Sequence, residues 1–299
     1  MSSAASLKDL HCDICGGHDV ALYHARAGRN VVRCSSCRMV FVDPMPSSEE
    51  KGEIEKRAYE TDLLPEVADF FRNCHRDFVD DPVIEGFRHG LRWMGEHRPP
   101  GRLLDVGPGT GIFLFLARRD FGWEPYGVDI CTASAVKAAA EFDIELDTGD
   151  FLTHDYPSGS FDAIAMLDML EHTVEPSATL KRASELLAPG GVLYVAVPNQ
   201  RSLMTVILDR WIRLGLPGAH FFLDRLYVEP HVYYFNPQAL RLAMVRAGLE
   251  PIGISGGNVH LGRYQLPLWM RIPMEIVLKL GAMVGMSAKV LALARKPTS

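Results

Sequence analysis

The sequence has no uncharged hydrophobic run long enough to cross a membrane. Its most apolar stretch, residues 272–293, is interrupted by Glu275, Lys279 and Lys289, which leaves nine uncharged residues between the last two. A membrane-spanning helix needs about 20 apolar residues. The first ten residues also lack the apolar run of a secretory signal, so we expect no export and a cytoplasmic protein.

An excess of positive charge is missing too. The 299 residues include 31 Lys and Arg against 37 Asp and Glu, for a formal net charge of −6. Non-specific binding to nucleic acid requires an extended basic surface, so nucleic acid is the less expected partner. Hydrophobic residues make up 47% and charged residues 23%, which excludes a disordered or low-complexity chain and indicates a globular one.

Few cysteines stand outside a pattern. Of six, only Cys74 and Cys131 are isolated, and the others form two Cys-x-x-Cys pairs. Four thiolates from two such pairs complete a tetrahedral zinc shell with no open position, so we predict one structural Zn²⁺ rather than redox pairs or ordinary buried thiols. This usage of cysteine fits a reducing compartment. The predicted zinc ligands are Cys12, Cys15, Cys34 and Cys37.

Three units follow one another along the chain. Residues 1–43 read as a zinc ribbon with short strands at 20–24 and 30–33, and residues 44–100 as a helical connector. From residue 101 to 299, short strands alternate with helical patterns, which predicts an α/β fold with a doubly wound parallel sheet. The strands are expected at 102–106, 125–129, 144–147, 161–167, 192–197, 251–255 and 290–295, and the helices at 112–119, 133–141, 177–187 and 237–247. Residues 200–236 interrupt the alternation and are predicted to be an insertion.

A glycine-rich turn follows the first strand of this unit. Gly107, Gly109 and Gly111 lie in Leu-Asp-Val-Gly-Pro-Gly-Thr-Gly, and glycine lets a ligand approach the backbone closely. A dinucleotide site would place its third glycine one residue later, so the spacing disfavours a nicotinamide cofactor. Asp129 ends the second strand, where a carboxylate can accept hydrogen bonds from a ribose. Together these features predict a nucleoside site.

A third feature, Gly-Asp-Phe, follows the third strand. Asp150 can accept a hydrogen bond from an adenine amino group there and Phe151 can cover the ring, although an aspartate after glycine is also an ordinary turn residue. We favour binding because both residues come at the carboxyl end of a strand.

The motifs around residues 102–199 resemble the class I S-adenosylmethionine-dependent methyltransferases, in the order found in that family. They are Leu-Asp-Val-Gly-Pro-Gly-Thr-Gly, Gly-Val-Asp, Gly-Asp-Phe, Phe-Asp-Ala-Ile, Leu-Glu-His and Leu-Leu-Ala-Pro-Gly-Gly-Val-Leu. The resemblance implies a seven-stranded Rossmann-like sheet whose last strand is antiparallel, with S-adenosylmethionine over the carboxyl ends of the first strands. It places Asp105 and the glycine loop near the methionine end, Asp129 at the ribose, and Asp150 and Phe151 at adenine. We also expect Asp168 to contact the cofactor.

The ribbon, followed by Val-Phe-Val-Asp-Pro-Met-Pro, resembles the zinc-ribbon subgroup of these enzymes, which includes sugar C-methyltransferases. These 299 residues have no counterpart of that subgroup's further C-terminal domain. The subgroup's Tyr-His-Glu-His stretch corresponds to Tyr227–His231, where Pro230 separates Glu229 from His231. The histidine aligns and the glutamate does not.

Two histidines are candidate bases for an acceptor that must lose a proton. We predict this role first for His231, and His172 is the second candidate, with a helix-start role as its alternative. Aromatic residues at 221–222 and 233–235 either pack the insertion onto the sheet or form a pocket wall.

Three functions are weighed on these grounds. The first is methyl transfer to a small-molecule acceptor: a sugar, a phenol or a lipid-pathway intermediate. The second is an RNA methyltransferase that binds substrate through the ribbon, which the near balance of five basic and four acidic residues in 1–43 disfavours. The third is a nicotinamide-binding or non-catalytic Rossmann protein. Residues 266–286 are apolar enough to touch a lipid surface or to pack within the fold or a dimer, and the sequence leaves the oligomeric state open.

Overall fold

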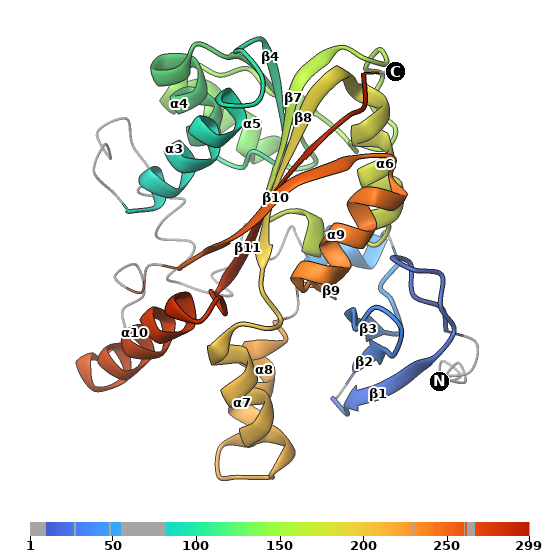
Figure 1. Cartoon of the computed structure of the whole chain (residues 1–299), viewed down its shortest axis with the longest axis vertical. Coiled ribbons are helices and arrows are strands. Elements are labelled where there is room, and N and C mark those ends of the chain that lie inside the picture. Colours follow the sequence, from blue (N-terminus) through green and yellow to red (C-terminus); the bar gives the residue numbers. More distant parts are fainter. Residues whose placement is uncertain are drawn as a thin grey trace.

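A seven-stranded sheet runs through the centre of the molecule (Figure 1). The computed structural model describes residues 10–26, 28–47, 49–54, 82–228, 230–259, 261 and 267–298. The order across the sheet is β10-β11-β8-β7-β4-β5-β6. β11 runs antiparallel to both of its neighbours, and the pairs from β8 to β6 are parallel. The strands are β4 (Arg102–Val106), β5 (Glu124–Asp129), β6 (Asp147–Thr148), β7 (Phe161–Leu167), β8 (Leu187–Pro198), β10 (Glu250–Gly257) and β11 (Lys289–Arg295).

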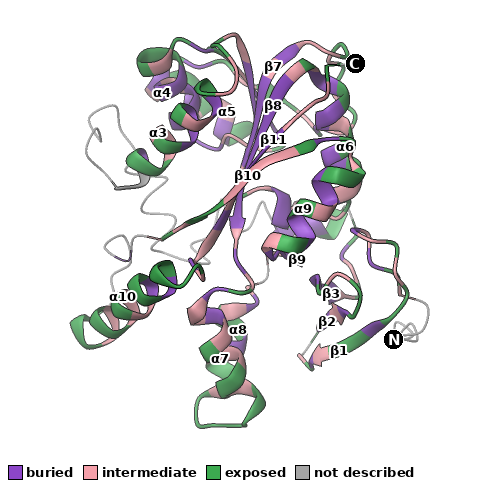
Figure 2. Cartoon of the chain, viewed as in Figure 1, coloured by how far each residue is buried: buried purple, intermediate pink, exposed green. Residues whose placement is uncertain are grey.

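Helices cover both faces of this sheet. α3 (Pro82–Gly95), α4 (Ile112–Phe121) and α5 (Thr132–Phe142) pack on one face, and α6 (Pro176–Leu186) and α9 (Pro237–Arg246) on the other (Figure 1). The central strands β4, β7 and β8 are buried along most of their length (Figure 2), as expected for near-continuous apolar strands covered on both sides. The predicted doubly wound α/β sheet with one antiparallel strand is confirmed.

One expected strand was wrong by three residues. The sequence predicted residues 144–147, whereas β6 contains only Asp147–Thr148. Ile144 is buried, and its N–H donates to the Ala138 carbonyl at 3.2 Å, so it closes the end of α5 instead. In the sequence, an apolar residue that packs at the end of a helix cannot be distinguished from the first residue of a buried strand.

The connections place three further helices beyond the carboxyl edge of the parallel strands. α7 (Leu203–Arg213) and α8 (Ala219–Leu226) follow β8 and form a projecting pair (Figure 1). α10 (Leu268–Met283) belongs to the connection from β10 to β11 and lies beyond the ends of these strands (Figure 1). α10 packs against the start of α7, where the Leu203 N–H donates to the Met286 carbonyl at 3.0 Å. Within the described residues, no helix has the length and apolar character needed to span a bilayer.

The ribbon forms a separate four-stranded sheet on the same side of the molecule. β1 (Val20–His24), β2 (Asn30–Cys34) and β3 (Val40–Asp43) are antiparallel, and β9 (Tyr233–Tyr234) adds to β3 as the fourth strand. The sequence did not predict this pairing, because β9 has only two residues and lies about 190 positions away from its partner.

Candidate functional site

The turn after β4 has three glycines in left-handed backbone conformations. Gly107, Gly109 and Gly111 have φ of 72°, 55° and 79°. A Cβ at Gly107 would lie 2.8 Å from the Met169 side chain, and one at Gly111 would lie 2.9 Å from the Ala138 side chain. The sequence therefore needs glycine here both for the turn and for the close packing around it.

Asp129 holds this turn at the end of β5. Its two carboxylate oxygens accept hydrogen bonds from the backbone N–H groups of Gly109 at 3.1 Å and Cys131 at 2.8 Å. A carboxylate offers about four lone-pair positions, so each oxygen retains capacity for a hydroxyl group of a ligand. Asp129 is thus both a support of the glycine loop and a candidate ribose ligand.

Asp105 lies beside Asp129 and is almost completely buried. Its Oδ1 has no hydrogen-bond partner among the described residues. Burial, with the neighbouring charge of Asp129 as the smaller cause, raises the pKa of Asp105 well above its usual value. A buried carboxylate with an unpaired oxygen next to the glycine loop fits a positively charged ligand group such as an ammonium.

Asp150 and Phe151 differ in exposure. Phe151 is buried in the core, whereas Asp150 is exposed and its Oδ1 accepts from the Leu152 N–H at 2.9 Å. The structure therefore shows the turn interaction that the sequence offered as the alternative for Asp150.

Asp168 follows β7 with a positive φ of 51°. Its carboxylate forms an ion pair with Lys289 at the start of β11, and its N–H donates to Ala196 on β8. These contacts fix Asp168 at the carboxyl edge, next to the one-turn helix η2 (Leu170–His172).

The two predicted histidines lie together, although 59 positions separate them in the chain. The rings of His172 and His231 are 4.6 Å apart, edge to face. The Val232 N–H donates to the Glu171 carbonyl at 2.9 Å, and this bond joins the insertion to η2. The Tyr234 hydroxyl donates to the His231 carbonyl at 3.2 Å and steadies the same segment.

Glu171 completes this cluster, and we had not predicted a role for it. Its side chain is 1% exposed, its Oε1 lies 4.0 Å from His231 Nε2, and neither carboxylate oxygen has a hydrogen-bond partner within the described residues. The adjacent Glu-His pair directly after a strand was the only sequence signal for it. Burial, helped by Asp168, raises the pKa of Glu171 well above its usual value.

Burial also keeps both imidazoles neutral. It lowers the pKa of His172 well below its usual value and that of His231 to about 4. The Lys51 ammonium acts in the same direction on both rings, and it donates a hydrogen bond to the Pro230 carbonyl at 2.8 Å. A neutral imidazole at pH 7 can accept a proton.

The aromatic residues near His231 pack the insertion rather than line an open wall. Tyr227, Tyr233, Tyr234 and Phe235 are at most 4% exposed. The rings of Tyr227 and Tyr234 are 4.9 Å apart, and Tyr233 stacks on Phe41 of the ribbon. Glu229 and Cys74, which the sequence also singled out, lie outside the described residues.

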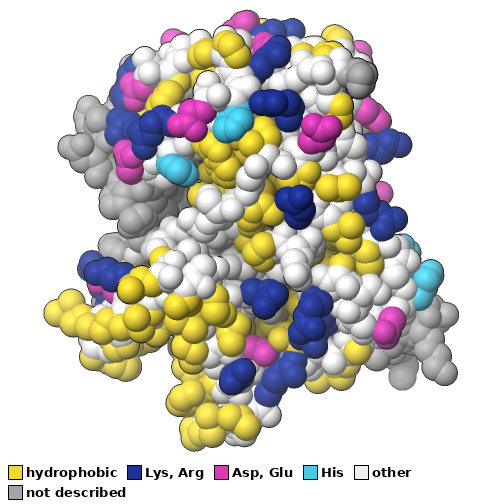
Figure 3. All heavy atoms as spheres, viewed as in Figure 1, with side chains coloured by type: hydrophobic (Ala, Val, Ile, Leu, Met, Phe, Trp, Pro, Cys, Tyr) yellow, Lys and Arg dark blue, Asp and Glu magenta, His cyan; other side chains and the backbone are white. Residues whose placement is uncertain are grey.

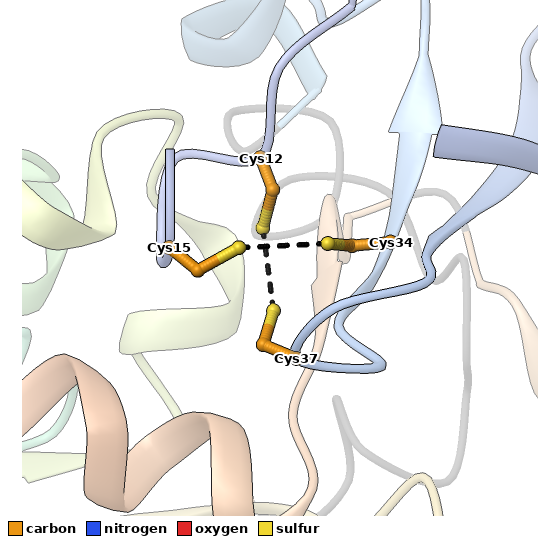
Figure 4. A group of neighbouring side chains, drawn as sticks. All are labelled: Cys12, Cys15, Cys34 and Cys37. Atoms are coloured by element: carbon orange, nitrogen blue, oxygen red, sulfur yellow. Dashed lines mark hydrogen bonds between the residues drawn. The ribbon is translucent and has the colours of Figure 1, made fainter. Parts of the chain in front are cut away.

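The four ribbon cysteines converge on one point (Figure 4). The Sγ atoms of Cys12 and Cys37 are 3.5 Å apart, as are those of Cys15 and Cys34. Tetrahedral zinc with Zn–S bonds of about 2.3 Å places its sulfurs about 3.8 Å apart, so these thiols fit a zinc ion with little movement. All four are free thiols.

A second group among the described residues has metal-binding donors. The ligand atoms of Glu171, His172 and His231 lie within 4.8 Å of one another. However, the Lys289 ammonium pairs with Asp168, and burial keeps the pKa of Glu171 raised in spite of the smaller opposing effects of Lys289 and Lys51, so the group holds less negative charge than its two carboxyls suggest.

A family model described as "Methyltransferase domain" matches residues 83–253. The chain is 28% identical over 206 residues to 2-methyl-6-phytyl-1,4-hydroquinone methyltransferase of Synechocystis sp., covering 65% of this chain and 60% of that protein. It is 26% identical over 181 residues to ubiquinone biosynthesis O-methyltransferase of Burkholderia thailandensis, covering 57% of this chain and 74% of that protein.

Among solved structures, the fold is similar to phosphoethanolamine N-methyltransferase 2 of Haemonchus contortus in complex with S-adenosyl-L-methionine. The TM-score is 0.57 at 15% identity, and the match covers 86% of this chain and 62% of that one. At this identity the likeness concerns the fold alone.

Proposed function

Since the chain belongs to the methyltransferase-domain family of class I S-adenosylmethionine-dependent enzymes, we propose that it methylates a phenolic or hydroquinone ring of a small lipid-pathway acceptor. One observation carries the proposal. Two groups of residues share one edge of the sheet, because they come at the carboxyl ends of neighbouring parallel strands. The glycine loop with Asp105 and Asp129 is at the ends of β4 and β5. Glu171 and His172 follow β7, and His231 contacts His172 there.

The cofactor half of the proposal rests on the first group. S-adenosylmethionine supplies an activated methyl group on a sulfonium. Asp105 would receive the ammonium of its methionine part, Asp129 the ribose hydroxyls, and the glycine loop would allow close approach of the backbone. We keep Asp150, Phe151 and Asp168 as proposed contacts of the cofactor.

Asp129→Ala should weaken S-adenosylmethionine binding by about 1–3 kcal/mol, because charge-assisted hydrogen bonds to the ribose are lost. Isothermal titration calorimetry measures this directly. Glu96→Ala removes a carboxylate of the same charge at an exposed position after α3 and should bind like the unmodified protein. Equal affinity of the Asp129 variant, or a preference for NAD, would refute the cofactor assignment.

The acceptor half rests on the second group and on the two relatives. Their names describe a hydroquinone methyltransferase and an O-methyltransferase of ubiquinone biosynthesis. Deprotonation of a ring hydroxyl makes both the oxygen and the neighbouring ring carbons more nucleophilic, so O- and C-methylation need the same base. We propose His231 for this role. His172, whose ring contacts the His231 ring, would position that imidazole.

Burial and the ammonium groups of Lys51 and Lys289 disfavour a charged His231 ring, and Asp168 favours it, so a second anion nearby is needed to stabilise the protonated ring. The neutral His231 ring accepts the hydroxyl proton as the methyl group arrives, and an ionised Glu171, 4.0 Å from Nε2, stabilises the imidazolium. Alignment of the two reactants supplies most of the remaining rate enhancement, because the methyl group is already activated.

We further propose that the four ribbon cysteines hold a structural zinc ion. Residues 1–43 then form the zinc ribbon, 44–100 the connector, and 101–299 the methyltransferase domain with its insertion at 200–236. The convergence of four free thiols supports this proposal. Because β9 pairs with β3, the ribbon would also hold the segment that carries His231.

The proposed reaction is tested with S-adenosylmethionine carrying a labelled methyl group and a panel of hydroquinones and catechols with short prenyl tails. Transfer of label to a ring oxygen or carbon supports the proposal. Transfer only to sugar acceptors or to RNA would reassign the acceptor.

A further inference from the structure

Exposed hydrophobic side chains gather on two segments of the molecule. Of the sixteen large hydrophobic residues that are exposed in the described part of the chain, twelve lie on the α7–α8 pair and its loop or on α10 and the residue after it. Figure 3 shows them as hydrophobic surface over α10 and over the projecting end of α7–α8. They are Ile207, Trp211, Leu214, Leu216, Phe221, Leu268, Trp269, Ile272, Ile276, Leu280, Met283 and Val284.

The spacing on α10 makes this a continuous stripe. Leu268, Ile272, Ile276 and Leu280 recur every four residues and lie on one side of the helix, while Leu278 and Gly281 are buried. The stripe is therefore the side of α10 that does not pack against the start of α7.

The loop between α7 and α8 is apolar as well. Residues 214–218 read Leu-Gly-Leu-Pro-Gly, without a charge, and Leu214 is 73% exposed at the turn. Leu214 and Leu216 extend the exposed apolar surface of Trp211 and Phe221, and a contiguous apolar patch of this kind marks an interaction site.

Charge on the same elements points to the nature of the partner. Residues 201–228 and 267–288 contain six basic and three acidic side chains, although the whole chain has a net charge of −6. Arg210 of α7 and Lys279 of α10 are exposed and form no ion pair within the described residues, whereas Arg213 pairs with Asp209 at 3.1 Å and Arg271 with Glu275 at 2.6 Å. Basic side chains thus flank the apolar projections, a combination that matches anionic headgroups above an apolar layer.

We propose that α10 and the α7–α8 pair dock on the surface of a bilayer containing anionic lipids. The apolar side chains insert at the level of the headgroups, with Trp211 and Trp269 at the interface, and the exposed Arg210 and Lys279 contact lipid phosphates. Two separate projections suit a deformable lipid surface better than the flat, continuous patch of a protein interface. Both follow the carboxyl edge of the sheet, so docking would bring that edge toward an acceptor with an apolar tail; this last point rests on the proposed function.

The test is co-sedimentation of the full chain with vesicles of phosphatidylcholine containing phosphatidylglycerol. We expect binding that weakens as salt is raised and falls at least tenfold in Trp269→Asp and in Leu214→Asp. Val136→Asp changes an equally exposed hydrophobic residue on α5 and should bind normally. All three positions are exposed, so the fold should persist, which circular dichroism checks.

Absence of vesicle binding, or equal binding by all variants, would overturn the proposal. Sedimentation showing a dimer that both Asp variants dissociate, without vesicle binding, would assign the surface to a second copy of the chain instead. Calorimetry with S-adenosylmethionine separates this proposal from the proposed function. Failure to bind the cofactor would refute the reaction and leave vesicle binding untouched, whereas normal cofactor binding without vesicle binding would refute only the docking surface.

Discussion

Cys34→Ser is expected to release zinc from the purified protein and to unfold the ribbon. A structural zinc site contributes about 10–16 kcal/mol, and a ribbon of some thirty residues has too small a core to fold without it. Cys34 is the last residue of β2 and is completely buried, so a serine there removes one thiolate ligand at a position that water cannot reach to replace it. Metal analysis should give one zinc per unmodified chain and much less than half an equivalent in the variant.

The same substitution should reduce methyl transfer, which tests the contact between the two units. β3 pairs with β9 through Val40 with Tyr234 and Phe41 with Tyr233, and His231 lies two residues before that strand. Loss of the ribbon therefore frees the segment that positions His231. Cys131→Ser is the control, since it removes a free thiol outside the cluster and should leave the zinc content unchanged. If unmodified protein that has never met a chelator contains no zinc, the ribbon is held by packing alone.

His231→Ala should lose about 10²–10⁴ in turnover with a hydroquinone acceptor while keeping its affinity for S-adenosylmethionine. The expected loss is that of a general base, and the proposed cofactor contacts Asp105 and Asp129 lie on β4 and β5 rather than on the insertion that carries His231. Steady-state rates and calorimetry measure the two effects separately. His172→Ala should mainly lower stability or acceptor binding. Normal turnover by the His231 variant would show that this residue serves only in packing.

The pH dependence of the methyl-transfer rate distinguishes a base from a residue that only packs. Burial lowers the pKa of His231 to about 4, so its ring stays neutral and able to accept a proton from pH 5 upward. The raised pKa of Glu171 means that its carboxylate forms only well above pH 4.5. The rate should therefore rise with pH as Glu171 loses its proton, and Glu171→Gln should abolish that rise. The charged groups facing this pair are Asp168 after β7, Lys289 of β11 and Lys51, and the His172 ring beside them is neutral.

The alternative use of this cluster has its own outcome. If metal analysis finds a second equivalent that disappears in Glu171→Gln but not in Cys34→Ser, then Glu171, His172 and His231 are ligands of a cation and His231 is not the base. A single equivalent that depends only on the cysteines supports the proton role.

Local features of the sequence determined most of the fold. Apolar runs such as Phe161–Leu167 form buried parallel strands wherever helices can cover both faces, and the order of strands and helices then leaves few topologies. The glycines at 107, 109 and 111 required a turn that only glycine adopts easily, so the loop was recognisable without a structure. The two Cys-x-x-Cys pairs predicted that four thiols would meet for the same reason: each pair is a short, self-contained unit.

Only the tertiary structure decided which distant groups meet and how they are charged. His172 and His231 are candidates in the sequence, but their ring contact, the buried Glu171 and the pairing of β9 with the ribbon all arise from contacts between residues tens to hundreds of positions apart. Burial then sets the protonation of the cluster, since a pKa depends on surroundings that no local pattern records. In the same way, the sequence marks residues 266–286 as apolar, but which side of α10 remains exposed depends on how this helix packs against α7.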